Sequence, residues 1–269
     1  MNATLTPQVE AQRQFTRLRT KWTFGILFVL PLIVVGAYAL GDGGDGGQRF
    51  SDLATTGSAN FTVFMLFVTA PLLLLIVATL FVGDAVPSEA SWASLRYLLT
   101  APVPRVRLLT SKLVVGLGST LLAMVTLLVW VILVGGVFYG WQSLTLPVGG
   151  VLDWPTMLTR LALASAYIFV ALLPFAAIAF WVGVRSDAPL AAVGFAVLAS
   201  IVSSILDALD ALGDWRHALP NHYAFEWVAL FGADPDYWAL LPGTLWALLW
   251  ATAFFALAYR HFARKDVLS

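Results

Sequence analysis

The sequence predicts an all-α integral membrane protein with six transmembrane helices, and three observations support this prediction. Of 269 residues, 60% are hydrophobic and only 11% are charged, and the mean hydropathy is +0.86. A soluble domain carries about 25% charged and about 45–50% apolar residues. Six apolar runs each supply the roughly 20 residues that cross a bilayer core, and polar segments separate them.

Composition and the placement of charges disfavour several classes of function. The formal net charge is zero and no dense basic run occurs, so we expect no nucleic-acid partner. The absence of cysteine excludes disulfides, thiolate metal sites and cysteine nucleophiles. Arg160 lies near the entrance of one apolar run, and Asp84 and Asp207 lie at the ends of others. Because ion-coupled carriers and membrane enzymes usually need ionisable groups at mid-bilayer depth, both classes are disfavoured.

The N-terminal residues 6–21 form a basic amphipathic segment. At helical spacing, its apolar face comprises Ala11, Phe15, Leu18 and Trp22, and its basic face comprises Arg13, Arg17 and Lys21. Such a helix lies in the plane of the lipid headgroups with its apolar side towards the hydrocarbon. The alternative is that the segment is a simple positive flank of the first span.

We expect the six spans at about residues 22–40, 61–82, 108–139, 157–184, 189–206 and 237–259. Pro31, Pro71 and Pro174 lie well inside three of these spans, and neighbouring helices can accommodate such prolines within a membrane. Residues 41–47, GDGGDGG, follow the first span. They lack the lysine and hydroxyl of a phosphate-binding G-x-x-x-x-G-K-[ST] loop, so we interpret them as a flexible acidic loop.

The charged segment between the second and third spans predicts a docking surface. Residues 87–112 form a short amphipathic helix, a corner at two prolines, and a run into the next span. Glu89 and Arg96 are seven residues apart and share one stripe of this helix, and Arg105 and Lys112 repeat the offset after the corner. A neighbouring apolar stripe comprises Trp92, Leu95 and Leu99.

Residues 207–239 are polar and aromatic, and they predict short interfacial or re-entrant helices that are broken at prolines. His222 and Glu226 are four residues apart and can share a helical face, and His217 lies five residues before His222. Two or three such nitrogen and oxygen ligands can bind a metal ion. Interfacial polar residues outside the membrane explain the same pattern, so we predict no metal site here.

The distribution of Lys and Arg indicates the orientation of the chain. With six spans, the N-terminal segment, the 84–112 segment, the 185–187 turn and the C-terminal tail share one side. Of the 15 Lys and Arg residues, the other side holds only Arg49, Arg160 and Arg216. Because cytoplasmic loops carry an excess of Lys and Arg, we expect both termini in the cytoplasm and a location in the cell (plasma or inner) membrane.

The 89–112 pattern resembles the cytoplasmic loop of ABC-2 type exporter permeases, the membrane subunits of type-2 ATP-binding-cassette (ABC) transporters. That loop carries a Glu, a short helix with a Leu pair, a Pro-x-x-Arg motif and a Lys seven residues beyond the Arg. Here these are Glu89, Leu98-Leu99, Pro102-Val103-Pro104-Arg105 and Lys112. Residues 91–94, Ser-Trp-Ala-Ser, depart from the Gly-Thr that the family often has there. The layout of spans, N-terminal helix and late helical excursion is also similar.

The resemblance implies that residues 1–269 form a single ABC-2 type transmembrane domain with a coupling loop at 84–107. A separate ATPase subunit, which holds ATP and Mg²⁺, docks on the coupling helix in this loop. A second permease, in a homodimer or with a paralogue, completes the pathway, and this chain carries no ATPase site or cofactor of its own. The docking residues on this interpretation are Glu89, Trp92, Leu95, Arg96, Leu99, Arg105 and Lys112.

The function that we expect is ATP-driven export by a permease subunit. Apolar span faces favour a lipophilic or amphiphilic substrate that enters from the membrane lipid. Two alternatives stay open at this point: a membrane anchor or assembly subunit that transports nothing, and an ion-coupled secondary transporter. Stimulation of the partner ATPase by lipophilic compounds separates export from anchoring, and uptake that collapses with the proton gradient marks an ion-coupled carrier.

Overall fold

The structure is a computed structural model and describes residues 7–40, 53–87, 105–146, 149–186 and 188–264. These residues are almost entirely helical, which confirms the predicted all-α fold class. Six helical segments among them are long and apolar enough to cross a membrane. They are Leu18–Leu40, Ser58–Gly83, Val106–Tyr139, Trp154–Arg185, Leu190–Asp207 and Leu240–Arg264.

The elements follow one another in a simple order. The longer helices are α1 (Pro7–Thr16), α2 (Leu18–Leu40), α4 (Ser58–Thr69), α5 (Leu75–Gly83), α8 (Arg105–Tyr139), α9 (Trp154–Arg185), α10 (Pro189–Asp207) and α11 (Leu240–Arg264). A π-helix, η2 (Ala70–Leu74), joins α4 to α5, and three 3₁₀ helices are η1 (Ala54–Thr56), η3 (Asp210–Ala218) and η4 (Glu226–Phe231). Strands β1 (Leu144–Thr145) and β2 (Val151–Leu152) pair antiparallel, with Leu144 opposite Leu152.

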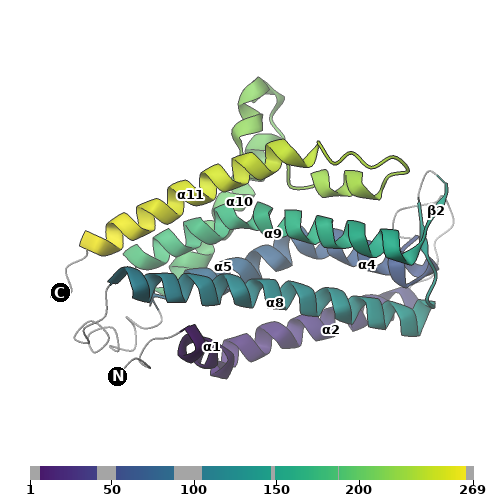
Figure 1. The fold of residues 1–269 in the computed structure, drawn as a ribbon, viewed down its shortest axis with the longest axis horizontal. Helices are drawn as coiled ribbons and strands as arrows, with labels where there is room; N and C mark the ends of the chain where they lie inside the picture. Colours follow the sequence, from purple (N-terminus) through teal and green to yellow (C-terminus); the bar gives the residue numbers. More distant parts are fainter. Residues whose placement is uncertain (1–6, 41–52, 88–104, 147–148, 187, 265–269) are drawn as a thin grey trace.

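The long helices lie side by side along the long axis of the molecule (Figure 1). Helix α8 packs against α2, α4 and α5, whereas α9 packs against α5, α10 and α11. The α4–η2–α5 segment therefore lies between two groups of helices. Helix α1 and the last turn of α11 lie at one end of the bundle, here called the N-terminal end, and the β1–β2 hairpin lies at the opposite, hairpin end (Figure 1).

A proline explains the break in the second membrane-crossing segment. Pro71 falls in the first turn of η2, where it cannot donate a backbone hydrogen bond. Its ring also clashes with the carbonyl one turn earlier in a regular α-helix, and a local π-turn relieves this clash. The helix therefore continues through the proline, as the sequence predicts, but with a wider turn halfway along it.

Glycines allow the helices to approach closely near the N-terminal end. The carbonyl oxygen of Gly83 in α5 occupies the space that a Cβ on Gly183 of α9 would need. A Cβ on Gly116 of α8 would lie only 2.9 Å from the carbonyl oxygen of Phe81 in α5. Small residues at such crossings bring helix backbones into contact in membranes. Near its C-terminal end, helix α5 therefore packs closely between α8 and α9.

The N-terminal segment differs from its prediction in one respect. The predicted helix at residues 6–21 is two helices, because α1 ends at Thr16 and α2 already begins at Leu18. Phe15 is exposed, and Leu18 and Trp22 are 68% and 67% exposed, so the predicted apolar face points away from the bundle. Glu10 and Gln14 of α1 are buried instead. The side of α1 that meets the bundle is thus polar.

Candidate coupling site

The candidate coupling site is the N-terminal end of the bundle, where α5 ends and α8 begins. Most of the predicted docking residues lie outside the part of the chain that the structure describes. These are Glu89, Trp92, Leu95, Arg96 and Leu99. Arg105 is the first residue of α8, and Lys112 follows two turns later. The described structure therefore shows the two ends of the predicted coupling loop, on α5 and on α8.

At the α8 end, Lys112 is buried against α1. Only 2% of the residue is exposed, and its Nζ lies 2.8 Å from Oε1 of Glu10, which is itself buried. The ammonium group thus faces the bundle interior and a carboxylate 102 residues earlier in the chain. A direct docking contact by this side chain requires α1 to move away first, and that contact stays a prediction.

At the α5 end, Asp84 is buried among arginines from the start of α2 and the residue before it. Asp84 follows the last residue of α5 and is 0% exposed. It forms ion pairs with Arg19 and with Arg17, whose Nη1 lies 3.5 Å from Oδ2 of Asp84. A carboxylate buried this deeply needs positive partners, because the cost of removing its charge from water is otherwise very large.

The ion pairs of Lys112 and Asp84 both connect the coupling-loop region to the N-terminal segment. Glu10, Arg17 and Arg19 all belong to the short stretch at α1 and the start of α2. Their partner Asp84 is the first residue of the predicted coupling loop at 84–107, and their partner Lys112 lies five residues after its end. The N-terminal segment therefore holds both ends of that loop at once. Thr110 of α8 adds a hydrogen bond of 2.8 Å to Tyr259 of α11, so the last helix is connected to the same end.

Exposed cations surround this buried cluster. Basic residues that are exposed at the N-terminal end include Arg13, Lys21, Arg107, Arg185, Arg260 and Arg264. They come from five helices, α1, α2, α8, α9 and α11, so positive charge is contributed from several sides of this end of the bundle. Such a surface suits contact with anionic lipid headgroups.

Comparison with known proteins places the chain in a family. Residues 14–203 match the family model described as ABC-2 family transporter protein. The chain belongs to the ABC-2 transporter family. The match runs from α1 into α10 and includes the whole predicted coupling loop. A search among curated proteins found no match.

Membership of the ABC-2 family decides the general role of the chain. It is a permease subunit of an ABC transporter and a multi-pass membrane protein. In this family the membrane component is not itself the ATPase, and an ATP-binding ABC subunit is its partner. The clustered charges at the N-terminal end of this ABC-2 permease therefore flank the loop on which such a partner is expected to act.

In this ABC-2 permease, the segment between α10 and α11 is attached by hydrogen bonds to α9 and α11. Arg160 of α9 donates from Nη1 to the carbonyl oxygens of Leu230 and Gly232, at 3.0 and 2.8 Å. The Tyr167 hydroxyl of α9 donates to the carbonyl of Tyr223 at 2.6 Å. A further anchor comes from α11, where the indole of Trp250 donates to the carbonyl of Ala218. This segment, residues 208–239, is here called the excursion.

The histidines of the excursion contact one another, Tyr223 and the end of α10. His222 and Glu226 do not share a helix, because residues 220–225 form turns and η4 begins at Glu226; that part of the prediction is wrong. Nδ1 of His222 lies 2.5 Å from Oδ1 of Asp207, and the His217 ring lies 4.6 Å from the His222 ring. No three His, Cys, Asp or Glu residues within the described ranges are grouped to hold a metal ion.

Burial raises the pKa of one tyrosine of the excursion, Tyr223. The Tyr223 hydroxyl lies 3.2 Å from Nδ1 of His217. Burial of this phenol and the nearby charge of Glu226 both raise the pKa of Tyr223 above its usual value, because each disfavours the phenolate. Tyr223 therefore stays neutral well above physiological pH and remains available as a hydrogen-bond donor to His217.

Proposed function

We propose that this permease forms the transmembrane pathway for ATP-driven export of a lipophilic or amphiphilic substrate, and that its ATPase partner docks on the coupling loop at 84–107. The observation that carries the proposal is the attachment of both ends of this loop to α1 and α2 through Asp84 and Lys112. A loop that transmits force has to be held rigidly where it joins the membrane helices. Buried ion pairs supply this rigidity, because breaking one costs about 3–5 kcal/mol.

The proposed path of the motion follows the packing. Displacement of the loop moves the end of α5, which touches α9 at Gly83 and Gly183 without intervening side chains. Since α9 also packs against α10 and α11, a displacement of the coupling loop is transmitted to all three of these helices. The ion pairs carry the same motion to α1 and α2. The substrate pathway opens or closes as these two groups of helices shift relative to one another.

The proposed orientation places the N-terminal end of the bundle in the cytoplasm of the plasma or inner membrane. The exposed cations at this end support it, because Lys and Arg accumulate on the cytoplasmic side. The excursion then lies towards the exterior. ATP is available only inside the cell, so a docking loop for an ATPase has to lie on that side.

The proposed working unit contains a second permease, identical or paralogous. Support comes from the apolar faces that α2, α10 and α11 expose within the described residues. Examples are Ile33, Leu190 and Leu245, each at least half exposed. Membrane lipid covers such faces in a single permease, and a second permease replaces lipid over part of them.

Co-purification tests the docking proposal. The permease is expressed together with a candidate ABC ATPase subunit, and the ATPase that it captures is quantified. We expect the double variant Glu89→Ala/Arg105→Ala to capture at least about tenfold less ATPase, because charged pairs that orient an interface each contribute a few kcal/mol. The matched control is Arg264→Ala, an exposed cation of the same end on α11. Capture that is equal for the double variant and the parent removes these two residues from the docking surface.

A further inference from the structure

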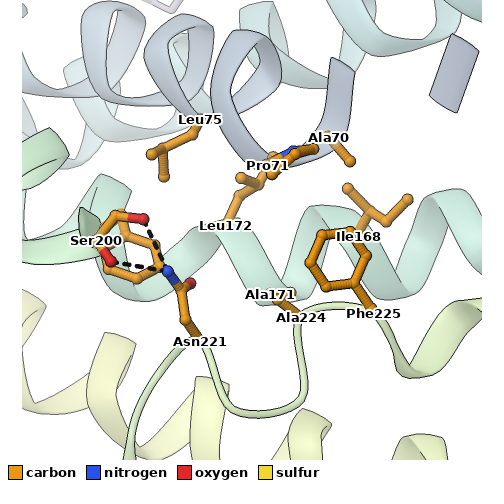
Figure 2. Close-up of a pocket in the computed structure, with 11 residues that line it drawn as sticks. Ala70, Pro71, Leu75, Ile168, Ala171, Leu172, Ser200, Asn221, Ala224 and Phe225 are labelled. Atoms are coloured by element: carbon orange, nitrogen blue, oxygen red, sulfur yellow. Dashed lines mark hydrogen bonds between the residues drawn. The ribbon is translucent and has the colours of Figure 1, made fainter. Parts of the chain in front are cut away.

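A small pocket lies halfway along the membrane-crossing helices (Figure 2). The wide turn η2 contributes Ala70 and Pro71, and α9 contributes Ala171 and its neighbours on the same face. The excursion closes the pocket with Asn221 and the two residues Ala224 and Phe225. Its volume is about 30 Å³. One water molecule needs roughly 10–15 Å³, so the pocket admits the tip of a slender chain and excludes a ring.

The excursion reaches this pocket because it folds back towards the membrane-crossing part of α10. Nδ2 of Asn221 donates to the carbonyl oxygen and to Oγ of Ser200, both at 2.9 Å, and to Oγ of Ser204 at 2.8 Å. The backbone N–H of Asn221 donates to Oγ of Ser203. Ser200 lies seven residues, or about 10 Å, before the end of α10. The loop at Asn221 is thus re-entrant.

The network also fixes which way the Asn221 amide faces. A backbone carbonyl can only accept a hydrogen bond, so the atom that faces the carbonyl of Ser200 has to be the amide nitrogen. The amide oxygen is then held on the side away from Ser200, as Figure 2 shows. Within the described part of the chain this oxygen has no hydrogen-bond partner. The pocket therefore contains one oriented acceptor.

The remaining lining determines which ligand chemistry fits. Apart from Ser200 and Asn221, every side chain that lines the pocket is apolar, and none is charged. An ionised group would lose its hydration there without a counter-charge, which is costly. A neutral donor such as a hydroxyl or an amide N–H satisfies the Asn221 oxygen instead. The π-turn at Pro71 forms one wall, and such turns are frequent at functional sites.

We propose that this pocket binds the neutral, hydrogen-bond-donating end of an amphiphilic substrate, with the donor on the amide oxygen of Asn221 and the adjoining carbons between η2 and α9. As a step of export, this rests on the proposed function; as a binding site, it does not need the ATPase. Asn221 then selects hydroxyl- or amide-ended molecules over ethers, esters and acids of the same length.

Photoaffinity labelling of the full chain in lipid nanodiscs tests the proposal. The probe is a long-chain primary alcohol with a diazirine beside the hydroxyl, and its matched partner is the methyl ether, which lacks the donor. Labelled peptides that cover residues 165–175 and 221–225 are quantified by mass spectrometry. We expect the alcohol to label them at least about fivefold more than the ether, as one hydrogen bond on a pre-oriented acceptor provides.

Two variants of α9 make the result specific. Ala171→Leu adds three carbons to the pocket wall, and we expect it to abolish the labelling. Ala166→Leu is the matched control, because Ala166 lies on the same helix but is exposed and does not line the pocket. A third variant, Asn221→Leu, should remove the preference for the alcohol over the ether, and its thermal stability is measured alongside.

Each result decides for or against the pocket. Equal labelling by alcohol and ether, or labelling that survives Ala171→Leu, overturns the proposal, because the probe then reports partition into lipid alone. The labelling assay contains no ATPase. A negative result of the co-purification experiment therefore does not change the expected labelling. Conversely, intact ATPase capture together with failed labelling leaves the permease assignment in place and removes only this site.

Discussion

Arg160 shows how far a single residue can be predicted. The sequence places an arginine near the start of an apolar span, which marks it as unusual, but its partners cannot be identified from the sequence. They are backbone carbonyls about 70 residues later, at Leu230 and Gly232, and a carbonyl has no signature in the sequence. The same holds for Asn221, whose partners on α10 become visible only when the loop is seen to turn back. Side chains that bind backbone are the part of such a site that sequence reasoning misses.

The Arg160 contacts lead to a prediction for the excursion. We expect Arg160→Met to lower the stability of the folded permease by about 2–4 kcal/mol, because one buried and one partly buried carbonyl lose a charged donor. The loss should appear as a lower Tm in detergent and as faster proteolysis within residues 219–239. Arg216→Met is the control: Arg216 binds the carboxylate of Asp210, which is 97% exposed at the side chain, and makes only long hydrogen bonds of 3.3 and 3.4 Å to the carbonyls of Gly213 and Asp207. Removing these contacts near the surface should cost about 1 kcal/mol. Similar effects of the two substitutions would contradict a clamping role for Arg160.

At the scale of elements, the sequence predicts the apolar face of the N-terminal segment but not its buried ion pairs. Helical spacing groups Phe15, Leu18 and Trp22 on one apolar face, and these side chains are exposed on the surface of the described structure. Their contact with the lipid headgroups stays a prediction. Helical spacing does not identify the roles of Glu10 and Arg19, which have buried partners in α8 and after α5. Amphipathic patterning reports which side of a helix avoids water. It cannot report that a polar side is buried against matching charges far along the chain.

The buried pair between α1 and α8 gives a prediction at this scale. Glu10→Gln and Lys112→Gln should each lower stability by about 3–5 kcal/mol, because each removes one charge of a buried pair. The exchanged double variant Glu10→Lys/Lys112→Glu restores opposite charges and should recover a large part of that loss. The measurement is a double-mutant cycle from thermal unfolding in nanodiscs.

The same variants separate stability from coupling. If α1 stabilises the coupling loop, the single variants should also lose the stimulation of the captured ATPase at temperatures where they are still folded. The exchanged variant should regain it. Single variants with full ATPase stimulation would show that the pair stabilises the fold but does not transmit force. This result would argue against the proposed transmission of motion to α1.

At the scale of the whole molecule, prediction succeeds best, and the reason is physical. The number and approximate positions of the spans depend on sums of hydropathy over about 20 residues, and such sums need no knowledge of long-range contacts. The packing that follows needs that knowledge. The close packing of α5 between α8 and α9 depends on glycines that are unremarkable in sequence until the backbones are seen to touch.

The orientation is the remaining whole-molecule prediction, and the chain is well suited to test it. It contains no cysteine, so a single introduced cysteine is a unique reporter. Asp214 in η3 and Arg264 at the end of α11 are both exposed, and they lie on opposite sides of the membrane in the proposed orientation. A membrane-impermeant maleimide should label Asp214→Cys in intact cells, and should label Arg264→Cys only after permeabilisation. The reverse pattern would place both ends of the coupling loop outside the cell, away from ATP, and docking of an ATPase there would have no energy source.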